Sequence, residues 1–492
     1  MRQHFLVDGL AGESELRDVV LNPYSGEPVA EVHLADAADA ERALWASVGG
    51  ARAMRALPPY AVAGILDRAA ALVEVRAGEF AALIVAESGK PLYDARGEVA
   101  RSVLNLRAAA EESKRVAGHE VPLDVDGAVS AYQGRRREGG AGRRRLAVTR
   151  KVPIGTVLAV TPFNFPLNLV LHKVAPAIAA RNAVILKPAP QTPLTGLLLG
   201  EVLLDAGLPP QALSVLPCSN DVAELLVRDD RVAMLTFTGS ARVGWYLKSC
   251  AGRKRVTLEL GGNGGVLIDE GCEELAYAAQ RACRGGFVFA GQYCIGVQRI
   301  LVHRSRYDEF LDLFLAETDR LVVGDPADEA TDVGPVIDVG SADRIDGWVR
   351  EAQAAGAQLL RGGQRTGNVI APTVLTGTDS GMQVEDEEVF GPVVTVNPVD
   401  SWSHGLARLN GSRYGLQLGV FSNDVGKALS AADALDAGTV VINDAPIYRI
   451  DTMPFGGVKD SGIGKEGTRY AMDNMTDTKL VILTAAATEA GQ

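Results

Sequence analysis

The sequence predicts an α/β protein built on a doubly wound parallel sheet, with a second α/β domain after it. Three observations predict this class. Strand-like and helix-like segments alternate from residue 152 onwards, as parallel strands joined by crossover helices require. A lysine and a glycine-serine pair follow two of the apolar strands, at the edge where such sheets bind ligands. The chain has 492 residues, which suggests about three domains.

Composition excludes several classes of protein. Hydrophobic residues make up 47% and charged residues 22% of the chain, as in an ordinary globular enzyme. The net charge of −12 disfavours a general nucleic-acid binder. We find no signal-peptide apolar region after Met1 and no apolar run long enough to span a membrane. Five widely spaced cysteines without a C-x-x-C pair predict no disulfide framework and no metal site, and they fit a reducing cytoplasm.

The first third of the chain predicts strands and then helices. A turn over residues 22–26 is expected between two short strands, and residues 61–118 predict two or more amphipathic helices that break at 87–91. Residues 134–145 hold two arginine triplets around a glycine-rich middle. Such a patch can bind nucleic acid, but the acidic chain and the lack of interleaved aromatics favour a solvated hairpin.

The alternating region gives each element in turn. We expect strands over 152–160, 183–186 and 232–237, with helices over 168–181 and 241–250. Thr192 can cap a further helix, with Pro193 at its first position and Gly207 at its end. There is no G-x-G-x-x-G, so this pattern alone is only weak evidence of nucleotide binding.

Three stretches carry groups that can do chemistry. Cys294 lies in an apolar segment after a Gly-Gln pair, where a cysteine is ordinarily a small packing residue. Glu259 ends an apolar run, which tends to raise the pKa of an acid and suits a general base. Asn164 offers an amide between aromatics and prolines, although it could equally be a turn residue. Together they indicate an acyl-transfer site with nucleophile, base and oxyanion donor.

These stretches resemble the aldehyde dehydrogenase superfamily, and four further motifs extend the likeness in the family's order over nearly the whole chain. The seven motifs span residues 162–166, 187–189, 237–240, 259–262, 291–294, 388–392 and 454–457.

The resemblance implies a domain organisation. It assigns residues 1–128 and 148–260 to a dinucleotide-binding domain, 261–435 to a catalytic domain, 129–147 and 476–492 to an oligomerisation arm and strand, and 436–475 to a return segment. The segment 478–483 is expected to be an exposed apolar strand that needs a partner. In the family this strand completes a sheet across a dimer interface, so the resemblance implies a homodimer or homotetramer.

The resemblance also implies roles for single residues. Cys294 would be the nucleophile, Glu259 would activate the hydrolytic water and can take the thiol proton, and Asn164 with the Cys294 N–H would form the oxyanion hole. Lys187 and Glu388 would hold ribose hydroxyls, although alone they suggest a surface lysine and a solvated acidic run. The other residues expected to line the cofactor site are Thr161, Pro162, Phe163, Pro190, Phe237, Gly239, Ser240, Val243, Leu260 and Phe390.

Two positions refine the expected reaction. Members that pass the acyl group to coenzyme A usually lack the glutamate at 259, so its presence favours release of a free acid. NAD-preferring relatives often have a glutamate where this chain has Pro190, and its absence removes a repulsion towards a ribose 2′-phosphate. NADP is therefore expected to be tolerated or even preferred, without excluding NAD. Residues 218–220 depart from the usual glycine-rich turn, which puts the adenosine contacts in doubt.

The substrate is the most open question. The chain resembles the branch of lactaldehyde, succinate-semialdehyde and non-phosphorylating glyceraldehyde-3-phosphate dehydrogenases, whose last members hold a phosphate with arginines. Arg115 and Arg449 match two of those positions, whereas Tyr293 and Phe165 do not. We expect a small aldehyde with a phosphonate, sulfonate, phosphate or carboxylate group, paired with these arginines. Phe165, Tyr293, Ile295 and Phe455 would complete the substrate site.

Other interpretations remain open at this point. The arginines could form surface or interface salt bridges, and the substrate could be a neutral short aldehyde such as lactaldehyde. The same thiol could cleave activated esters without nicotinamide. The fold could also serve a catalytically silent structural or binding protein.

Overall fold

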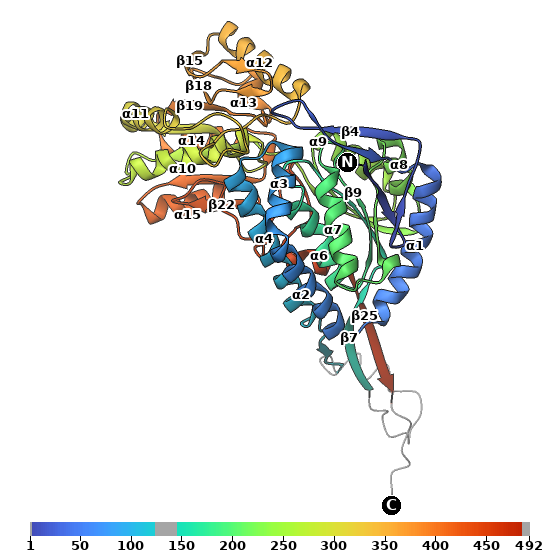
Figure 1. The fold of residues 1–492 in the computed structure, drawn as a ribbon. Helices are drawn as coiled ribbons and strands as arrows, with labels where there is room; N and C mark the ends of the chain where they lie inside the picture. The colour runs from blue at the N-terminus through green and yellow to red at the C-terminus, as the bar shows by residue number, and fades with distance from the viewer. Residues whose placement is uncertain (1, 124–144, 485–492) are drawn as a thin grey trace, which may run out of the picture.

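The structure is a computed structural model that describes residues 2–123 and 145–484. The predicted arginine-rich hairpin and most of the predicted oligomerisation arm lie outside these residues. Two large sheets flanked by helices form the body of the molecule, and a narrow β arm extends from it (Figure 1).

The N-terminal part agrees with the predicted turn between strands. The Asn22 side chain accepts hydrogen bonds from the backbone N–H groups of Tyr24 and Ser25, and Gly26 has a positive φ of 74°. The strands of the small sheet are β1 (Arg2–Gln3), β5 (Pro28–His33) and β4 (Arg17–Leu21). Four helices follow: α1 (Ala37–Ala56), α2 (Pro59–Val75), α3 (Ala77–Ser88) and α4 (Leu92–Ser113).

The first large sheet is doubly wound. Its order is β24 (Gly462–Ile463), β12 (Arg255–Glu259), β11 (Val232–Thr238), β8 (Thr156–Val160), β9 (Ala183–Lys187), β10 (Leu213–Val215), β2 (Phe5–Val7) and β3 (Leu10–Gly12). The five strands from β12 to β10 are parallel. The chain winds outward in both directions from β8, so the crevice at the carboxyl end of β8 is the expected ligand site.

The prediction of one strand over 152–160 was wrong. Two strands occupy this stretch, β7 (Arg145–Pro153) in the arm and β8 in the sheet. Gly155 separates them with a φ of 124°, a conformation that residues with a Cβ rarely adopt.

Helices cover both faces of this sheet. On one face lie α6 (Asn168–Ala179) and α7 (Pro193–Asp205), backed by α2, α3 and α4, and on the other lie α1, α8 (Asn220–Arg228) and α9 (Ala241–Cys250). Gly207 follows the end of α7 with a φ of 89°, as predicted. The Thr192 side chain makes no capping hydrogen bond, which corrects the prediction. The buried Glu87 carboxylate on α3 accepts instead from the N–H groups of Leu194 and Thr195.

The second large sheet holds the remaining core. Its order is β15 (Gln358–Arg361), β18 (Thr373–Thr376), β19 (Val393–Val399), β14 (Val297–His303), β13 (Gly264–Ile268), β21 (Gln417–Phe421) and β22 (Thr439–Ile442). One face packs on α10 (Leu275–Phe287), α11 (Tyr307–Thr318) and α12 (Val339–Ala354), and the other on α14 (Trp402–Asn410) and α15 (Val425–Ala434). The sheet extends to residue 442, beyond the expected boundary at 435.

Short elements complete the fold. They are β16 (Arg365–Thr366), β17 (Val369–Ile370), β20 (Tyr414–Gly415), β23 (Val458–Lys459), α13 (Gln383–Asp386) and α16 (Thr468–Asn474). Within the described ranges, no single helix is long and apolar enough to cross a membrane, although the bent pair α1–α2 passes that test jointly.

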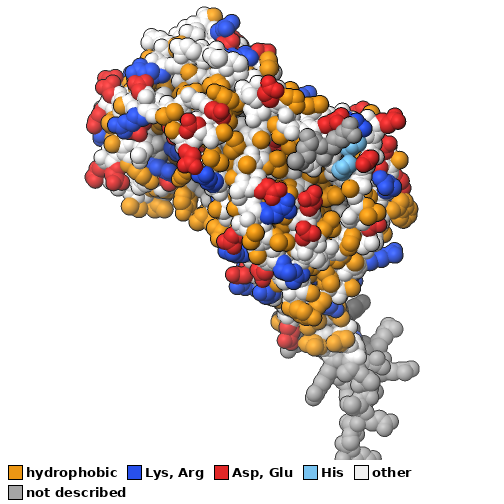
Figure 2. Space-filling model, in the orientation of Figure 1, with side chains coloured by type: hydrophobic (Ala, Val, Ile, Leu, Met, Phe, Trp, Pro, Cys, Tyr) orange, Lys and Arg blue, Asp and Glu red, His pale blue; other side chains and the backbone are white. Residues whose placement is uncertain are grey.

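The arm is a three-stranded antiparallel sheet. β25 (Thr476–Thr484) pairs with β7 along its whole length, and β6 (Glu120–Val121) adds to the other side of β7. The arm projects below the body in Figure 1. Hydrophobic side chains gather at its base in Figure 2, and Leu480, Ile482 and Leu483 of β25 are each more than half exposed.

Candidate active site

The carboxyl ends of four parallel strands bring the predicted site residues together. In the strand register Val160 of β8 lies opposite both Lys187 of β9 and Phe237 of β11, and Thr238 lies opposite Glu259 of β12. The segment after β8 carries Asn164. Residues up to 100 positions apart therefore meet at one edge of the sheet, where β8 reverses the winding direction.

A strained turn presents Cys294 to this edge. After α10, Phe289 and Ala290 have positive φ angles of 48° and 52°, and Gly291 follows with 69°. Gln292 holds the turn with its side chain, which donates to the carbonyls of Phe289 and Pro335 and accepts from the Ile337 N–H. Strain of this kind persists only where the surroundings hold it, and it is common at active sites.

Cys294 is a neutral thiol in the resting site. Burial raises its pKa to about 12, while the positive charge of Arg449 acts in the opposite direction. The Cys294 carbonyl lies so close to Gly262 that a Cβ at position 262 would sit 2.2 Å from its oxygen. A thiol with this pKa needs a base to become a nucleophile.

Asn164 reaches the segment that carries the cysteine. Its buried side chain donates from Nδ2 to the Gln292 carbonyl at 3.0 Å, two residues before Cys294. The amide has a second N–H donor, for which the described residues offer no acceptor. The Asn164 amide is thus fixed close to Cys294, and one of its two N–H groups is free to donate to a ligand.

Glu259 is a buried acid without hydrogen bonds. Both carboxylate oxygens lack a partner among the described residues, and the side chain is 3% exposed. Burial raises its pKa well above 4.5, and the negative charge of Glu466 raises it further. Such an acid is primed to accept a proton near neutral pH.

Glu466 is the ionised neighbour of this acid. Its carboxylate lies 2.6 Å from the buried Lys173 ammonium. Burial by itself raises the pKa of Glu466, but the positive charges around it, that of Lys173 first, outweigh burial and hold it at about 2. The environment thus raises the pKa of Glu259 and lowers that of Glu466. Active sites use this pattern to keep one acid as a proton acceptor and the other as a permanent negative charge.

The predicted cofactor residues line the same crevice and leave polar groups unsatisfied. The buried Lys187 ammonium has one hydrogen bond, 3.1 Å to the Pro188 carbonyl, and can donate two more. The hydroxyls of Thr161 and Thr238, at the ends of β8 and β11, are buried without partners among the described residues. Burial raises the pKa of Glu388 to about 7, while its Oε1 accepts from the Gly262 N–H at 2.8 Å. Unpaired buried donors and acceptors on one crevice fit a polar ligand such as a dinucleotide.

The other predicted cofactor residues form its walls. Phe163 meets Phe390 edge to face, with ring centroids 5.7 Å apart. Ser240 caps α9 by accepting from the Val243 N–H, and the preceding Gly239 leaves space that a Cβ would fill against the Phe237 ring. Leu260 is buried against Gly244 of α9, and Pro162 is half-buried after Thr161.

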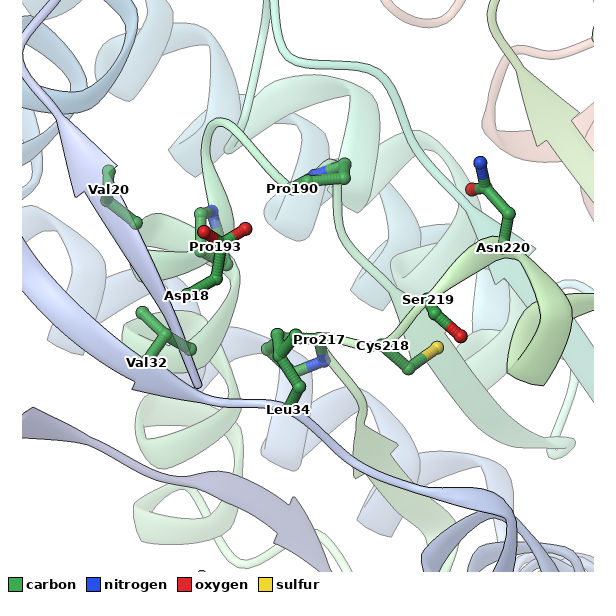
Figure 3. A pocket seen from close by; sticks show the side chains of 10 residues that line it. All are labelled: Asp18, Val20, Val32, Leu34, Pro190, Pro193, Pro217, Cys218, Ser219 and Asn220. Carbon is green, nitrogen blue, oxygen red and sulfur yellow. The ribbon is translucent and has the colours of Figure 1, made fainter. Parts of the chain in front are cut away.

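A cavity of about 280 Å³ includes Pro190, one of the predicted cofactor residues (Figure 3). Strand β4 supplies Asp18 and Val20 to one wall, the segment over 217–220 forms the facing wall, and Pro190 lies between them. The two departures noted in the sequence, at 190 and at 218–220, therefore meet in one cavity. Its lining side chains include one carboxylate and neither a lysine nor an arginine: Asp18, Val20, Val32, Leu34, Pro190, Pro193, Pro217, Cys218, Ser219 and Asn220.

Arg449 lies in the site, whereas Arg115 does not. The Arg449 side chain is 7% exposed, stacks 3.6 Å above the Phe455 ring and has no partner for its Nε among the described residues. Arg115 lies past the end of α4, is 61% exposed and pairs with Glu111 and Glu112. The expectation that Arg115 holds the substrate is therefore corrected, because its side chain points to solvent and pairs with glutamates of its own segment.

Sequence reasoning missed Arg101, which takes the place expected for Arg115. It lies on α4, about 18 Å along the helix axis from the last helical residue, Ser113, and Arg115 lies beyond that end. Its Nη1 is 3.5 Å from the Tyr293 hydroxyl, and its Nη2 is 2.6 Å from Asp451. The choice between these two arginines depends on which part of α4 faces Tyr293, and the sequence gives no local signal for that.

The remaining predicted substrate residues pack together beside Cys294. The Phe165 and Tyr293 rings meet edge to face at 4.8 Å. Ile295 and Phe455 are buried together, and Tyr293 and Cys294 pack against them. All five cysteines lie in the described part of the chain and are free thiols, and no group of three potential metal ligands occurs there.

Comparison with known proteins agrees with this geometry. The model of the aldehyde dehydrogenase family matches residues 11–481. The 3-sulfolactaldehyde dehydrogenase of Priestia aryabhattai is 41% identical over 465 residues, which are 94% of each chain. The crystal structure of aldehyde dehydrogenase 21 from Physcomitrella patens, in complex with the reaction product succinate, is 40% identical, covers 98% of both chains and has a TM-score of 0.93. The glyceraldehyde-3-phosphate dehydrogenase of Methanocaldococcus jannaschii, complexed with NADP, is 35% identical, with a TM-score of 0.89 over 96% of this chain and 100% of that one.

A thiol beside an unpaired base and an amide donor, at the ligand edge of a doubly wound sheet, is what the family's reaction needs. The family model covers nearly the whole chain, and the dehydrogenases compared above align with 94% to 98% of it. The chain belongs to the aldehyde dehydrogenase family and is an NAD(P)-dependent aldehyde dehydrogenase.

Proposed function

We propose that the protein oxidises a small aldehyde carrying an anionic group to its carboxylic acid, through a thiohemiacetal and a thioester on Cys294. The observation that carries this proposal is Arg449, a buried cation with an unpaired donor that stacks on a ring next to the thiol. A buried guanidinium with an unsatisfied N–H is costly unless an anion pairs with it. The names of two similar proteins, which refer to a sulfonated aldehyde and to succinate, support the same class of substrate.

The chain's own residues account for the first half of the reaction. Glu259 takes the proton of the Cys294 thiol, and the sulfur forms a bond to the carbonyl carbon of the aldehyde. The oxygen that becomes negative is held by the spare N–H of Asn164 and by the Cys294 backbone N–H. A bound nicotinamide would supply the acceptor for the hydride of this carbon, so that Cys294 would be left holding the acyl group as a thioester.

Hydrolysis completes the turnover. Glu259 first returns the thiol proton to solvent and then removes a proton from a water molecule that attacks the thioester carbon. The C–S bond breaks, the acid leaves, and the sulfur is protonated again. The raised pKa of Glu259 suits both steps, because it makes this carboxylate a stronger base than a solvated one.

The cofactor would lie along the crevice at the ends of β8, β9 and β11. Lys187 and Glu388 would hold the ribose hydroxyls, and the unpaired Thr161 hydroxyl offers a further contact. Pro190 leaves room for the 2′-phosphate of NADP, so we infer that NADP is accepted. Asp18, in the cavity that includes Pro190, works against that phosphate, and NAD is therefore also used.

The second cation of the anion site is Arg101 rather than Arg115. Arg101 contacts the Tyr293 hydroxyl, and Arg449 stacks on the Phe455 ring. Asp451 pairs with Arg101 at 2.6 Å, whereas the carboxylate nearest to Arg449, that of Glu466, stays 3.6 Å away, so Arg449 supplies most of the attraction.

We also infer a homodimer or homotetramer built through the edge of β25, whose apolar side chains are exposed. The five free cysteines fit the expectation of a reducing cytoplasm.

The test is nicotinamide reduction with NAD and NADP over pairs of charged and neutral aldehydes of equal length. We expect turnover in the wild type, none in Cys294→Ala, and a loss in Arg449→Ala of about 10- to 100-fold in kcat/KM for the charged aldehyde only. Arg115→Ala is the matched control and should leave kcat/KM unchanged for both the charged and the neutral aldehyde.

Equal losses for both aldehydes in Arg449→Ala would sink the anionic substrate and favour a neutral one such as lactaldehyde. Ester cleavage without nicotinamide would favour an esterase. Cofactor binding without any turnover would favour a silent member of the fold.

A further inference from the structure

Arg449 has a second buried neighbour that its role does not explain, the side chain of His172 on α6. The His172 ring is 1% exposed. Its Nδ1 faces Arg449 Nη2 at 3.3 Å, and its Nε2 faces Asp451 Oδ1 at 3.0 Å. A histidine between a guanidinium and a carboxylate has only one arrangement of its proton that satisfies both.

The partners fix that arrangement. A guanidinium only donates hydrogen bonds, so the Nδ1 that it faces must be the acceptor. A carboxylate only accepts, so the Nε2 that faces it must carry the hydrogen. The ring is then neutral, in the Nε2–H form. Burial lowers its pKa, and the charge of Arg449 lowers it further, in agreement with this form.

This neutral ring leaves the charge of Arg449 available. The nearest carboxylate to Arg449 is Glu466, whose Oε2 lies 3.6 Å from Nη2: this is an ion pair without a hydrogen bond, because Lys173 takes the other oxygen, Oε1, at 2.6 Å. Arg101, in contrast, is paired directly with Asp451. Asp451 therefore serves both arginines, directly for Arg101 and through the His172 ring for Arg449. The ring fixes Arg449 without neutralising it.

On the basis of the anion site proposed above, we propose that His172 is its positioning residue: the Nδ1 lone pair holds Arg449 Nη2, so that the unpaired Nε–H of Arg449 meets the anionic group of the substrate. His172 touches no reacting atom in this scheme. It acts on the binding of charged aldehydes and leaves the chemistry at Cys294 alone.

Two partial replacements separate the two hydrogen bonds of the ring. Asparagine can place an oxygen near the Nδ1 position and keep the acceptor for Arg449, while glutamine can place an N–H near Nε2 and keep the donor to Asp451. We expect His172→Asn to stay within about threefold of the wild type for the charged aldehyde. His172→Gln and His172→Leu should each raise its KM by about ten- to hundredfold, with kcat within about threefold and with the neutral aldehyde unaffected.

A double-mutant cycle shows whether the effect passes through Arg449. In the Arg449→Ala background, His172→Leu should cause no further loss for the charged aldehyde. Asn105→Ala on α4 is the control, since Asn105 is equally buried and its amide nitrogen has no hydrogen bond among the described residues. It should leave the ratio of charged to neutral kcat/KM unchanged.

The outcomes distinguish this inference from the proposed function. If Arg449→Ala fails to discriminate between charged and neutral aldehydes, the anion site itself is wrong. If Arg449→Ala discriminates but asparagine and glutamine at 172 behave alike, or the losses add in the double variant, then only the role of His172 is wrong.

Discussion

At the scale of single residues, the site depends on groups that are buried without partners. Glu259 has no hydrogen bond to either oxygen, and its raised pKa follows from burial and from the charge of Glu466. A surface glutamate would be ionised at any physiological pH and would be a weaker base. The lack of a partner is therefore what equips Glu259 for proton transfer.

Glu259→Gln should stop the reaction at the thioester. We expect a first turnover that yields about one equivalent of reduced nicotinamide per site, followed by a steady rate lower by about 100-fold or more. Stopped-flow absorbance would resolve the burst. A variant that turns over steadily at the wild-type rate would remove Glu259 from the hydrolytic step.

The pH dependence has a definite sign. The base form of Glu259 is lost as pH falls through its raised pKa, so the wild-type kcat should rise with pH over that range. The residual rate of Glu259→Gln should lack this rise. A wild-type profile that is flat from pH 5 to 8 would contradict the raised pKa.

Asp18 lies in the same cavity as Pro190, where NAD-preferring relatives often have a glutamate, and it can disfavour NADP in place of that glutamate. The 2′-phosphate of NADP would approach a cavity with one carboxylate and no basic side chain. Asp18→Asn should raise the ratio of NADP to NAD kcat/KM by about fivefold, the effect of one partly screened charge. The exposed Asp230→Asn is the control, and an equal response in both would mean that Asp18 has no special place.

At the scale of elements, buried ion pairs anchor the helices that carry the site. Lys90 and Glu98 form a pair with no exposed side-chain surface. Glu98 also accepts from the N–H groups of Leu167 and Asn168, which begin α6, and the Lys90 ammonium lies 3.5 Å above the Phe165 ring. One pair therefore fixes both the start of α6 and the ring next to Tyr293.

Glu98→Gln should destabilise the fold because it leaves a buried, unpaired ammonium. We expect a loss on the order of 3 kcal/mol, seen as a lower thermal midpoint in scanning fluorimetry. Adding Lys90→Met removes the orphaned charge and should recover much of the loss. If the double variant is less stable than Glu98→Gln alone, the unpaired charge is not the cause.

At the scale of the whole molecule, the arm is the surface through which we expect the protein to bind further copies of itself. β25 is an edge strand with Leu480 and Ile482 more than half exposed. Changing both to lysine should reduce the assembly to smaller species in light scattering coupled to size exclusion. Leu104→Lys on α4, an equally exposed leucine, should leave the assembly intact. A monomeric wild type would overturn the inferred oligomer.

The sequence by itself determined the local features of this protein. These features are visible in short stretches of sequence: the alternation of strands and helices, the glycine after α7, and the apolar residues around Cys294 and Glu259. The alternation alone predicts the doubly wound sheet, without knowledge of any tertiary contact. The predicted cofactor residues Lys187 and Phe237 lie on the two sides of Val160 at the end of β8, because strand ends in such a sheet share an edge.

Only the tertiary structure decided which distant side chains act together. Arg101 rather than Arg115 reaches Tyr293, since the packing of α4 determines which of its turns meets that side chain. Glu87 from another helix caps α7, and His172 bridges Asp451 and Arg449 across more than 270 residues. Hydrogen bonds between buried polar groups depend on positions fixed by the packing of whole elements, which no local pattern records.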